Sequence, residues 1–250
     1  MEYPRLLSCL DADFTRLRQV ARDLSAPVPS CPGWTVDQLV RHVGMVYLHK
    51  VRAMRQPGDK EPDWPPPGVA DEPTLALLDR AYAELTAEFA GRKPDERAGT
   101  WYEPEQTVGF WIRRMAQETV IHRVDAELAA GEPFAPIPDD LALDGIDEVL
   151  QVFLSYLSVT WREDFAESLP TKALPPVLVR AGEQGSLVRA APEGVTVTAA
   201  DPGVRAAATV SGPPTGMLLW LWRRADEGIT REGDQELIDR LYLLLRDATQ

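Results

Sequence analysis

The chain has 250 residues, 44% of them hydrophobic, which suits one large globular domain or two smaller ones. Its formal net charge of −13 argues against nucleic acid or an anionic membrane as the main partner, because both require a basic surface. No run approaches the roughly 18–20 apolar residues of a membrane span, and no secretory signal is visible. The two cysteines, Cys9 and Cys31, form no CxxC motif, so we expect a cytoplasmic protein with free and chemically inert thiols.

Apolar residues recur at helical spacing in four segments of the first half of the chain. These predicted helices span about 3–24, 35 onward, 72–91 and 111–131. Thr35 with Gln38 three residues later is typical of a capping box at the start of the second helix. Residues 57–73 contain six prolines and therefore form a loop, where Trp64 is predicted to anchor onto the helices, with a pocket wall as the alternative.

The segment 111–131 carries chemically reactive side chains on one face. Glu118 and His122 are four residues apart, so both project from the same side of a helix. They continue a stripe that consists of Trp111, Met115, Glu118, His122, Asp125 and Ala129. A surface helix with a solvated Glu–His pair is one interpretation. The other is a buried pair that needs a partner, for which a divalent metal is suitable.

The chain has only three histidines, His42, His49 and His122. His42 lies at the edge of the apolar face of the second helix, so its side chain should point into a helical bundle. Its alternative role is a core histidine bonded to a backbone carbonyl. His49 lies one heptad further and is expected to be exposed rather than a ligand.

The second half of the chain changes its periodicity. Residues 139–167 predict a fifth helical stretch, and the proline-rich segment 168–176 predicts a domain boundary. Four short β-like runs follow, at 177–181, 186–190, 195–199 and 204–210, and then two helices at about 213–224 and 234–247. The predicted fold class is α+β with two domains, a helical domain over 1–167 and a small antiparallel sheet with helices over 177–250.

Two stretches, CPGWTVDQLVRH and ETVIHRVDAELAAG, together resemble the mycothiol-dependent maleylpyruvate isomerase-like family. The resemblance implies a DinB-like four-helix bundle followed by a sterol-carrier-like domain. It also implies a divalent metal held by His42, Glu118 and His122, with mycothiol as the thiol cofactor. The segment LLWLWRRADEG resembles the part of the family that supplies an arginine to the metal cleft, which implies a catalytic role for Arg224. Arg223 stands where a smaller residue is expected, so either arginine could face the cleft.

Three protein ligands leave coordination positions open, as in catalytic rather than structural metal sites. Nitrogen and oxygen donors suit Zn²⁺, with Ni²⁺, Co²⁺ or Fe²⁺ as alternatives. The same donors occur in iron oxygenases, a chemistry that the resemblance disfavours. Asp125 is predicted either to orient a ligand or to form a salt bridge with Arg41, Arg113 or Arg114.

The predicted function is that of a metal- and mycothiol-dependent isomerase or thiol S-transferase. Its substrates would be small electrophilic or anionic molecules, and the protein would be a monomer or homodimer. The alternative from a different class is a non-catalytic metal-binding module with a sensing or regulatory role. A hydrophobic-ligand carrier is less favoured, because the C-terminal module is short for enclosing a large ligand.

Overall fold

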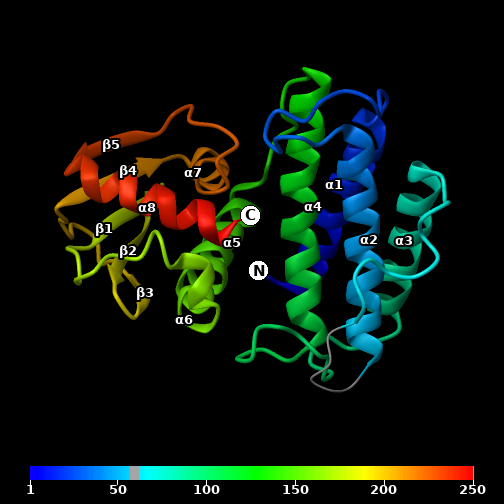
Figure 1. Cartoon of the computed structure of the whole chain (residues 1–250), viewed down its shortest axis with the longest axis horizontal. Helices are drawn as coiled ribbons and strands as arrows, with labels where there is room; N and C mark the ends of the chain where they lie inside the picture. The colour runs from blue at the N-terminus through cyan, green and yellow to red at the C-terminus, as the bar shows by residue number, and fades with distance from the viewer. Residues whose placement is uncertain (57–61, 250) are drawn as a thin grey trace. The chain divides into compact units, whose positions relative to one another are not determined.

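The computed structural model describes residues 1–56 and 62–249, and the chain divides into two compact units, Met1–Pro136 and Ile137–Gln250 (Figure 1). The first unit is helical and the second combines helices with a sheet, which confirms the predicted fold class. No helix in the described part of the chain is both long and apolar enough to span a membrane.

The first unit is built from long helices that pack along their lengths (Figure 1). They are α1 (Tyr3–Val20), α2 (Val36–Arg55), α3 (Thr74–Ala90) and α4 (Val108–Ala130). The predicted helices are confirmed, with ends that differ by a few residues. α1 packs mainly on α4 and α2 mainly on α3, while α2 also contacts α4. α4 is therefore packed from more than one side, which explains why most of its residues are buried.

Side chains and glycine fix the ends of the two helices that matter most for function. Thr35 forms the predicted capping box with Gln38 at the start of α2. The hydroxyl of Thr107 accepts a hydrogen bond from the backbone N–H of Phe110 at the start of α4. Gly131 ends α4 in the left-handed conformation, at φ 64°, which a residue with a Cβ adopts only with strain.

The loop after α2 is attached to that helix at two places. His49 Nε2 lies 3.0 Å from the carbonyl oxygen of Pro62. The Arg41 guanidinium donates to the carbonyl oxygens of Val69, Ala70 and Glu72. Residues 57–61, which include Pro57 of the predicted loop, lie outside the described residues.

The prediction that His49 is exposed is wrong. Its side chain is 3% exposed, because the loop segment around Pro62 and Trp64 covers it. The helical period places His49 correctly on α2, but the covering segment comes from a loop whose path the period does not encode.

The second unit begins with a helical segment that the sequence assigns to the first domain. It consists of α5 (Asp139–Asp147), the π-helix η1 (Glu148–Tyr156), α6 (Leu157–Thr160) and the 3₁₀ turn η2 (Arg162–Phe165). These elements pack on α7 (Pro214–Leu221), α8 (Gln235–Ala248) and the sheet. The compact units therefore divide at Pro136–Ile137 rather than within 168–176, and the predicted ranges 1–167 and 177–250 need correction. The apolar face of 139–167 is buried within the second unit. The change of periodicity at residue 168 does not indicate in which unit this face is buried.

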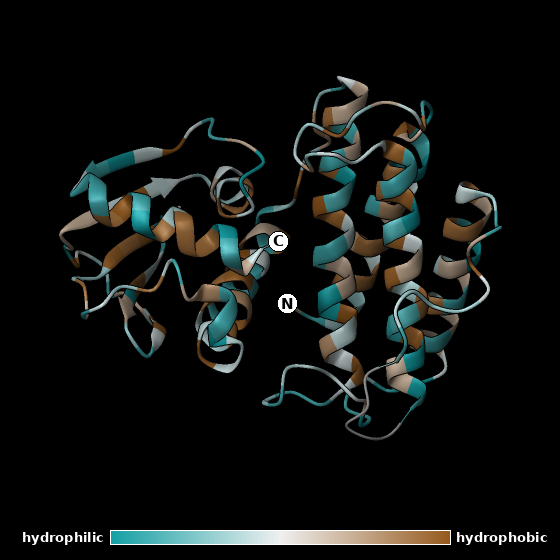
Figure 2. Cartoon of the chain, viewed as in Figure 1, coloured by the Kyte–Doolittle hydropathy of each residue, from teal (hydrophilic) through white to brown (hydrophobic). Residues whose placement is uncertain are grey.

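The sheet of the second unit has five strands in the described residues, in the order β3-β2-β1-β4-β5. They are β1 (Val177–Ala181), β2 (Gln184–Ala191), β3 (Gly194–Ala199), β4 (Ala208–Gly212) and β5 (Thr230–Gly233). The sheet is mostly antiparallel, as predicted, but β1 and β4 pair in parallel. α8 packs on β1, β4 and β5 and shows hydrophobic and hydrophilic residues along its length, as expected for a helix with one buried face (Figure 2).

Candidate metal centre

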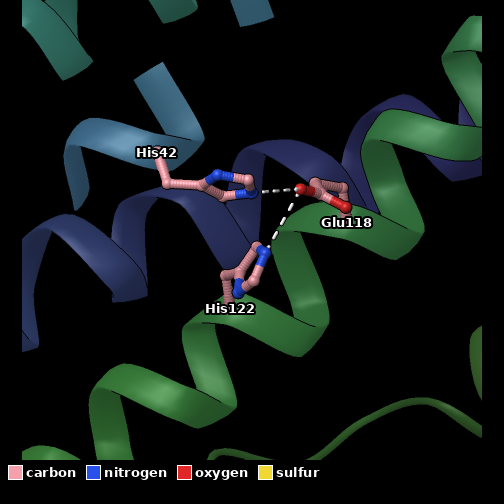
Figure 3. Close-up of side chains that lie close together, drawn as sticks. All are labelled: His42, Glu118 and His122. Atoms are coloured by element: carbon pink, nitrogen blue, oxygen red, sulfur yellow. Dashed lines mark ion pairs between the residues drawn. The ribbon is translucent and has the colours of Figure 1, made fainter. Parts of the chain in front are cut away.

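The three predicted ligand residues lie together within the first unit (Figure 3). Glu118 and His122 project from one face of α4, and His42 reaches them from α2. Glu118 Oε1 lies 3.4 Å from His42 Nε2 and 3.2 Å from His122 Nε2. One oxygen of Glu118 thus faces two imidazole nitrogens, and the three donor atoms lie within 4.8 Å of one another.

Neighbouring side chains hold Glu118 and His122 in position. Arg114 is 4% exposed and donates from Nη2 to Glu118 Oε2 over 2.7 Å, which leaves Oε1 for the two histidines. His122 Nδ1 lies 2.9 Å from Asp125 Oδ2, and Asp125 is fully buried. The hydroxyl of Ser30 donates to the other oxygen of Asp125 over 2.5 Å. This arrangement supports the interpretation that Asp125 orients His122.

Two of the three alternative partners predicted for Asp125 have contacts elsewhere. Arg41 holds the loop after α2, and Arg114 holds Glu118. Sequence reasoning considered Arg114 only as a salt-bridge partner of Asp125, and it missed Ser30. Arg114 had one usable signal, its position four residues before Glu118, whereas the contact from Ser30 depends on how the turn before α2 folds back.

Charges around the cluster shift the pKa values of its buried groups. Burial alone would lower the pKa of His122, but the carboxylates of Glu118 and Asp125 outweigh it and raise that pKa to about 9. Burial would raise the pKa of Glu118, but His122, His42 and Arg114 together hold it well below its usual value. The cluster therefore stabilises an ionised Glu118 beside a protonated His122.

The donor geometry fits a divalent cation. Ligand atoms that bind Zn²⁺ at about 2.0–2.1 Å in tetrahedral geometry lie about 3.3–3.5 Å apart. The separations of 3.2 and 3.4 Å around Glu118 Oε1 are close to that range. A metal-binding histidine usually donates its second ring N–H to a carboxylate, which is the contact that His122 makes with Asp125. Two imidazoles and a carboxylate also suit Ni²⁺, Co²⁺ and Fe²⁺.

Two indoles lie beside the cluster. The His42 ring centroid is 5.0 Å from that of Trp34 and 6.0 Å from that of Trp64. Trp34 belongs to the turn before α2 and is half-buried, whereas Trp64 is 51% exposed. Tyr47, one turn beyond Val43 on α2, is fully buried and bonds Thr119, so it belongs to the core rather than to the site.

The two arginines predicted for the site lie in the second unit, after α7. Arg223 has φ 61°, a left-handed conformation that is unusual for a residue with a side chain. Its Nη2 donates to the carbonyl oxygen of Thr249, and burial lowers its pKa. Arg224 is half-buried, and its Nη1 donates to the carbonyl oxygen of Trp222.

Comparisons with known proteins follow this division of the chain. Residues 7–127 match the model of the mycothiol maleylpyruvate isomerase N-terminal domain, and residues 140–240 match the corresponding C-terminal domain. The fold resembles a crystal structure of the mycothiol-dependent maleylpyruvate isomerase, with 16% identity, a TM-score of 0.61 and 93% of each chain covered. A histidine-to-alanine mutant of that isomerase matches with 15% identity, a TM-score of 0.63 and the same coverage. A comparison with curated proteins finds no match.

The fold class is therefore that of two-domain proteins with a helical unit followed by an α+β unit. Both family models match, in order, over most of the chain, so this protein belongs to the mycothiol maleylpyruvate isomerase family. The resemblance in the sequence is confirmed at the level of family and fold.

Proposed function

We propose that this protein is a metal-dependent enzyme that uses mycothiol, either as an isomerase or as a thiol S-transferase. Its substrates are small electrophilic or anionic molecules. The observation that supports this most directly is the convergence of His42, Glu118 and His122 on one point, with Asp125 and Arg114 holding two of them from behind. Membership of a family named for mycothiol supports the thiol as the second component.

Each residue of the metal-binding cluster has a distinct role in this proposal. His42, Glu118 and His122 provide three donors to a cation, Zn²⁺ above its alternatives, and leave its remaining positions for ligands. A bound dication would lower the pKa of a thiol and polarise an oxygen of the substrate. Arg114 keeps Glu118 Oε2 occupied, so that the carboxylate presents one oxygen to the donors. Asp125 holds the His122 ring in the orientation that presents Nε2.

The role of an arginine at an anionic substrate fits Arg224 better than Arg223. The Arg223 side chain is directed to the carbonyl oxygen and hydroxyl of Thr249, next to the end of α8. Arg224 stands beside the Trp222 ring, and its Nη1 donates to the backbone carbonyl oxygen of Trp222. A guanidinium can bind a carboxylate through two parallel hydrogen bonds, which suits a small anionic substrate.

The metal is tested first, because the rest of the proposal depends on it. Purified protein should contain about one divalent ion per chain by elemental analysis, and His122→Ala and Glu118→Ala should each lose most of it. His49→Gln is the matched control, since His49 lies on α2 beyond His42 but bonds Pro62 instead of the cluster. Undiminished metal in both ligand variants would overturn the metal centre.

Calorimetry with mycothiol then separates an enzyme from the non-catalytic alternative. The metal-loaded wild type should bind mycothiol, and Glu118→Ala without metal should bind it at least tenfold more weakly. A wild type that holds metal but binds no mycothiol would contradict the enzyme and favour a metal-binding sensor or regulatory module.

A further inference from the structure

The segment from Pro62 to Thr74 is fixed at both ends on α2. At one end, His49 Nε2 contacts the carbonyl oxygen of Pro62 over 3.0 Å. At the other, Arg41 donates to the carbonyl oxygens of Val69 and Glu72 over 2.6 and 2.7 Å. These attachments flank His42 in sequence and hold the intervening residues over the same stretch of the helix.

This attachment places a large aromatic side chain next to the metal ligands. The Trp64 ring centroid lies 5.6 Å from that of His49 and 6.0 Å from that of His42. Even so, 51% of Trp64 is exposed, the largest value among the tryptophans that the structure describes as exposed. Exposure of an indole to water is energetically unfavourable, and exposed aromatic surface held in one place commonly marks a binding site.

The exposed side of the cluster is the side on which Trp64 lies. The His42 side chain is 27% exposed, compared with 15% for Glu118 and 12% for His122. His42 is therefore the ligand residue nearest to solvent within its unit, and it is the one that contacts the Trp64 ring. Trp34 contacts the His42 ring too, but it is half-buried and serves to pack the imidazole.

We propose that Trp64 is a specificity-determining residue of the metal centre and forms the apolar wall against which a ligand lies. The inference rests on the proposed function, because the ligand must be one whose thiol or oxygen reaches the cation. It adds the chemical class: a molecule with a flat or apolar ring one or two bonds from its metal-binding atom. Such a ring covers the exposed indole face while the polar atom reaches the three donors.

The test uses the full chain loaded with Co²⁺, whose absorption reports both the bound metal and a bound thiol. Two thiols of similar acidity serve as probes, phenylmethanethiol with a ring and 2-mercaptoethanol without one. The wild type should bind phenylmethanethiol about tenfold more tightly, a typical effect for one aromatic contact that excludes water. Trp64→Ala should bring this ratio close to one, while Trp64→Phe should keep most of it.

The control is Trp161→Ala, which removes an indole of similar exposure, 46%, from the second unit and should leave the ratio unchanged. If the ratio of the affinities for the two thiols stays near ten in Trp64→Ala, the proposal that Trp64 forms the apolar wall is overturned. An equal loss of Co²⁺ and of both thiols in Trp64→Ala also overturns it, because Trp64 would then only position His42. A wild type without a Co²⁺ spectrum overturns the proposed function as well, so the two failures are distinguishable.

Discussion

The charge of the His122 imidazole depends strongly on its neighbours. Glu118 and Asp125 raise its pKa to about 9 in the metal-free protein, against 6.5 for an ordinary histidine. A raised pKa means that the protonated ring stabilises the fold. This contribution is fully present below pH 6.5 and is lost as the pH rises through 9. A metal, in contrast, requires the neutral ring.

We therefore expect the affinity for Zn²⁺ to rise with pH, about tenfold per unit between pH 7 and 9, as one proton leaves His122. Competition with a chelator of known affinity, at several pH values, measures this slope. Calorimetry in buffers of different ionisation enthalpy counts the released proton. An affinity that does not change over this range would contradict the proton count and the assignment of His122 as a ligand.

At the residue level, local spacing predicted the part of the site that lies within one turn of helix. Glu118 and His122 were predictable because four residues complete one turn of α4. His42 needed the family resemblance, since nothing in its own helix indicates which distant side chains it meets. The burial of His49 and the contact from Ser30 to Asp125 were not predictable, because each depends on a loop that folds back onto a helix.

Among the helices, α1 and α4 are joined by buried charges as well as by apolar packing. Arg123 on α4 is 1% exposed and donates to Asp13 on α1 and to Glu127 one turn further along α4. Glu127 also accepts from Arg16 of α1. Every charged residue of the sequence RVDAE thus has an assigned contact, with Arg123 and Glu127 tying α4 to α1 and Asp125 holding His122.

Removal of the Arg123 guanidinium should lower the stability of the fold. Arg123→Met leaves the Asp13 and Glu127 carboxylates buried without their shared partner, so the free energy of unfolding should fall by about 3–5 kcal/mol. Arg18→Met is the control, because the Arg18–Asp79 pair is exposed and should contribute less than about 1 kcal/mol. Urea denaturation at neutral pH measures both values, and similar losses in the two variants would show that the buried network is not a major source of stability.

Helical periodicity predicted the helices of the first unit well, but two elements of the second unit were not predicted. The nine-residue π-helix Glu148–Tyr156 lies inside a stretch that reads as an ordinary α-helix, because its apolar pattern is compatible with either winding. The strand β5, Thr230–Gly233, has no apolar alternation and is exposed along its length, so only its pairing with β4 defines it.

At the scale of the whole chain, the candidate metal centre belongs to one unit. The three donor residues, together with Arg114, Asp125 and Ser30, all lie within Met1–Pro136. We expect a fragment of residues 1–136 to fold and to bind Zn²⁺ within about tenfold of the affinity of the full chain. Circular dichroism and chelator competition measure the two properties.

A fragment of residues 1–167, which ends at the boundary predicted from the sequence, provides the comparison. It carries α5 without α7 and η1 without β3 and α8, on which they pack, and so should expose Leu141, Ile146 and Val149, which are buried in the full chain. It should be less soluble than the shorter fragment. The opposite ranking would show that the segment 139–167 belongs with the first unit after all.

The cluster also joins two distant parts of the chain, since His42 belongs to α2 and both other donors to α4. A cation held there would act as a cross-link that closes a loop, and all of α3 lies inside that loop although it supplies no donor to the cluster. Closing the loop restricts the unfolded ensemble, much as a disulfide between the same helices would. The stabilisation would therefore extend to α3, whose backbone amides should exchange more slowly with solvent once the cation is bound.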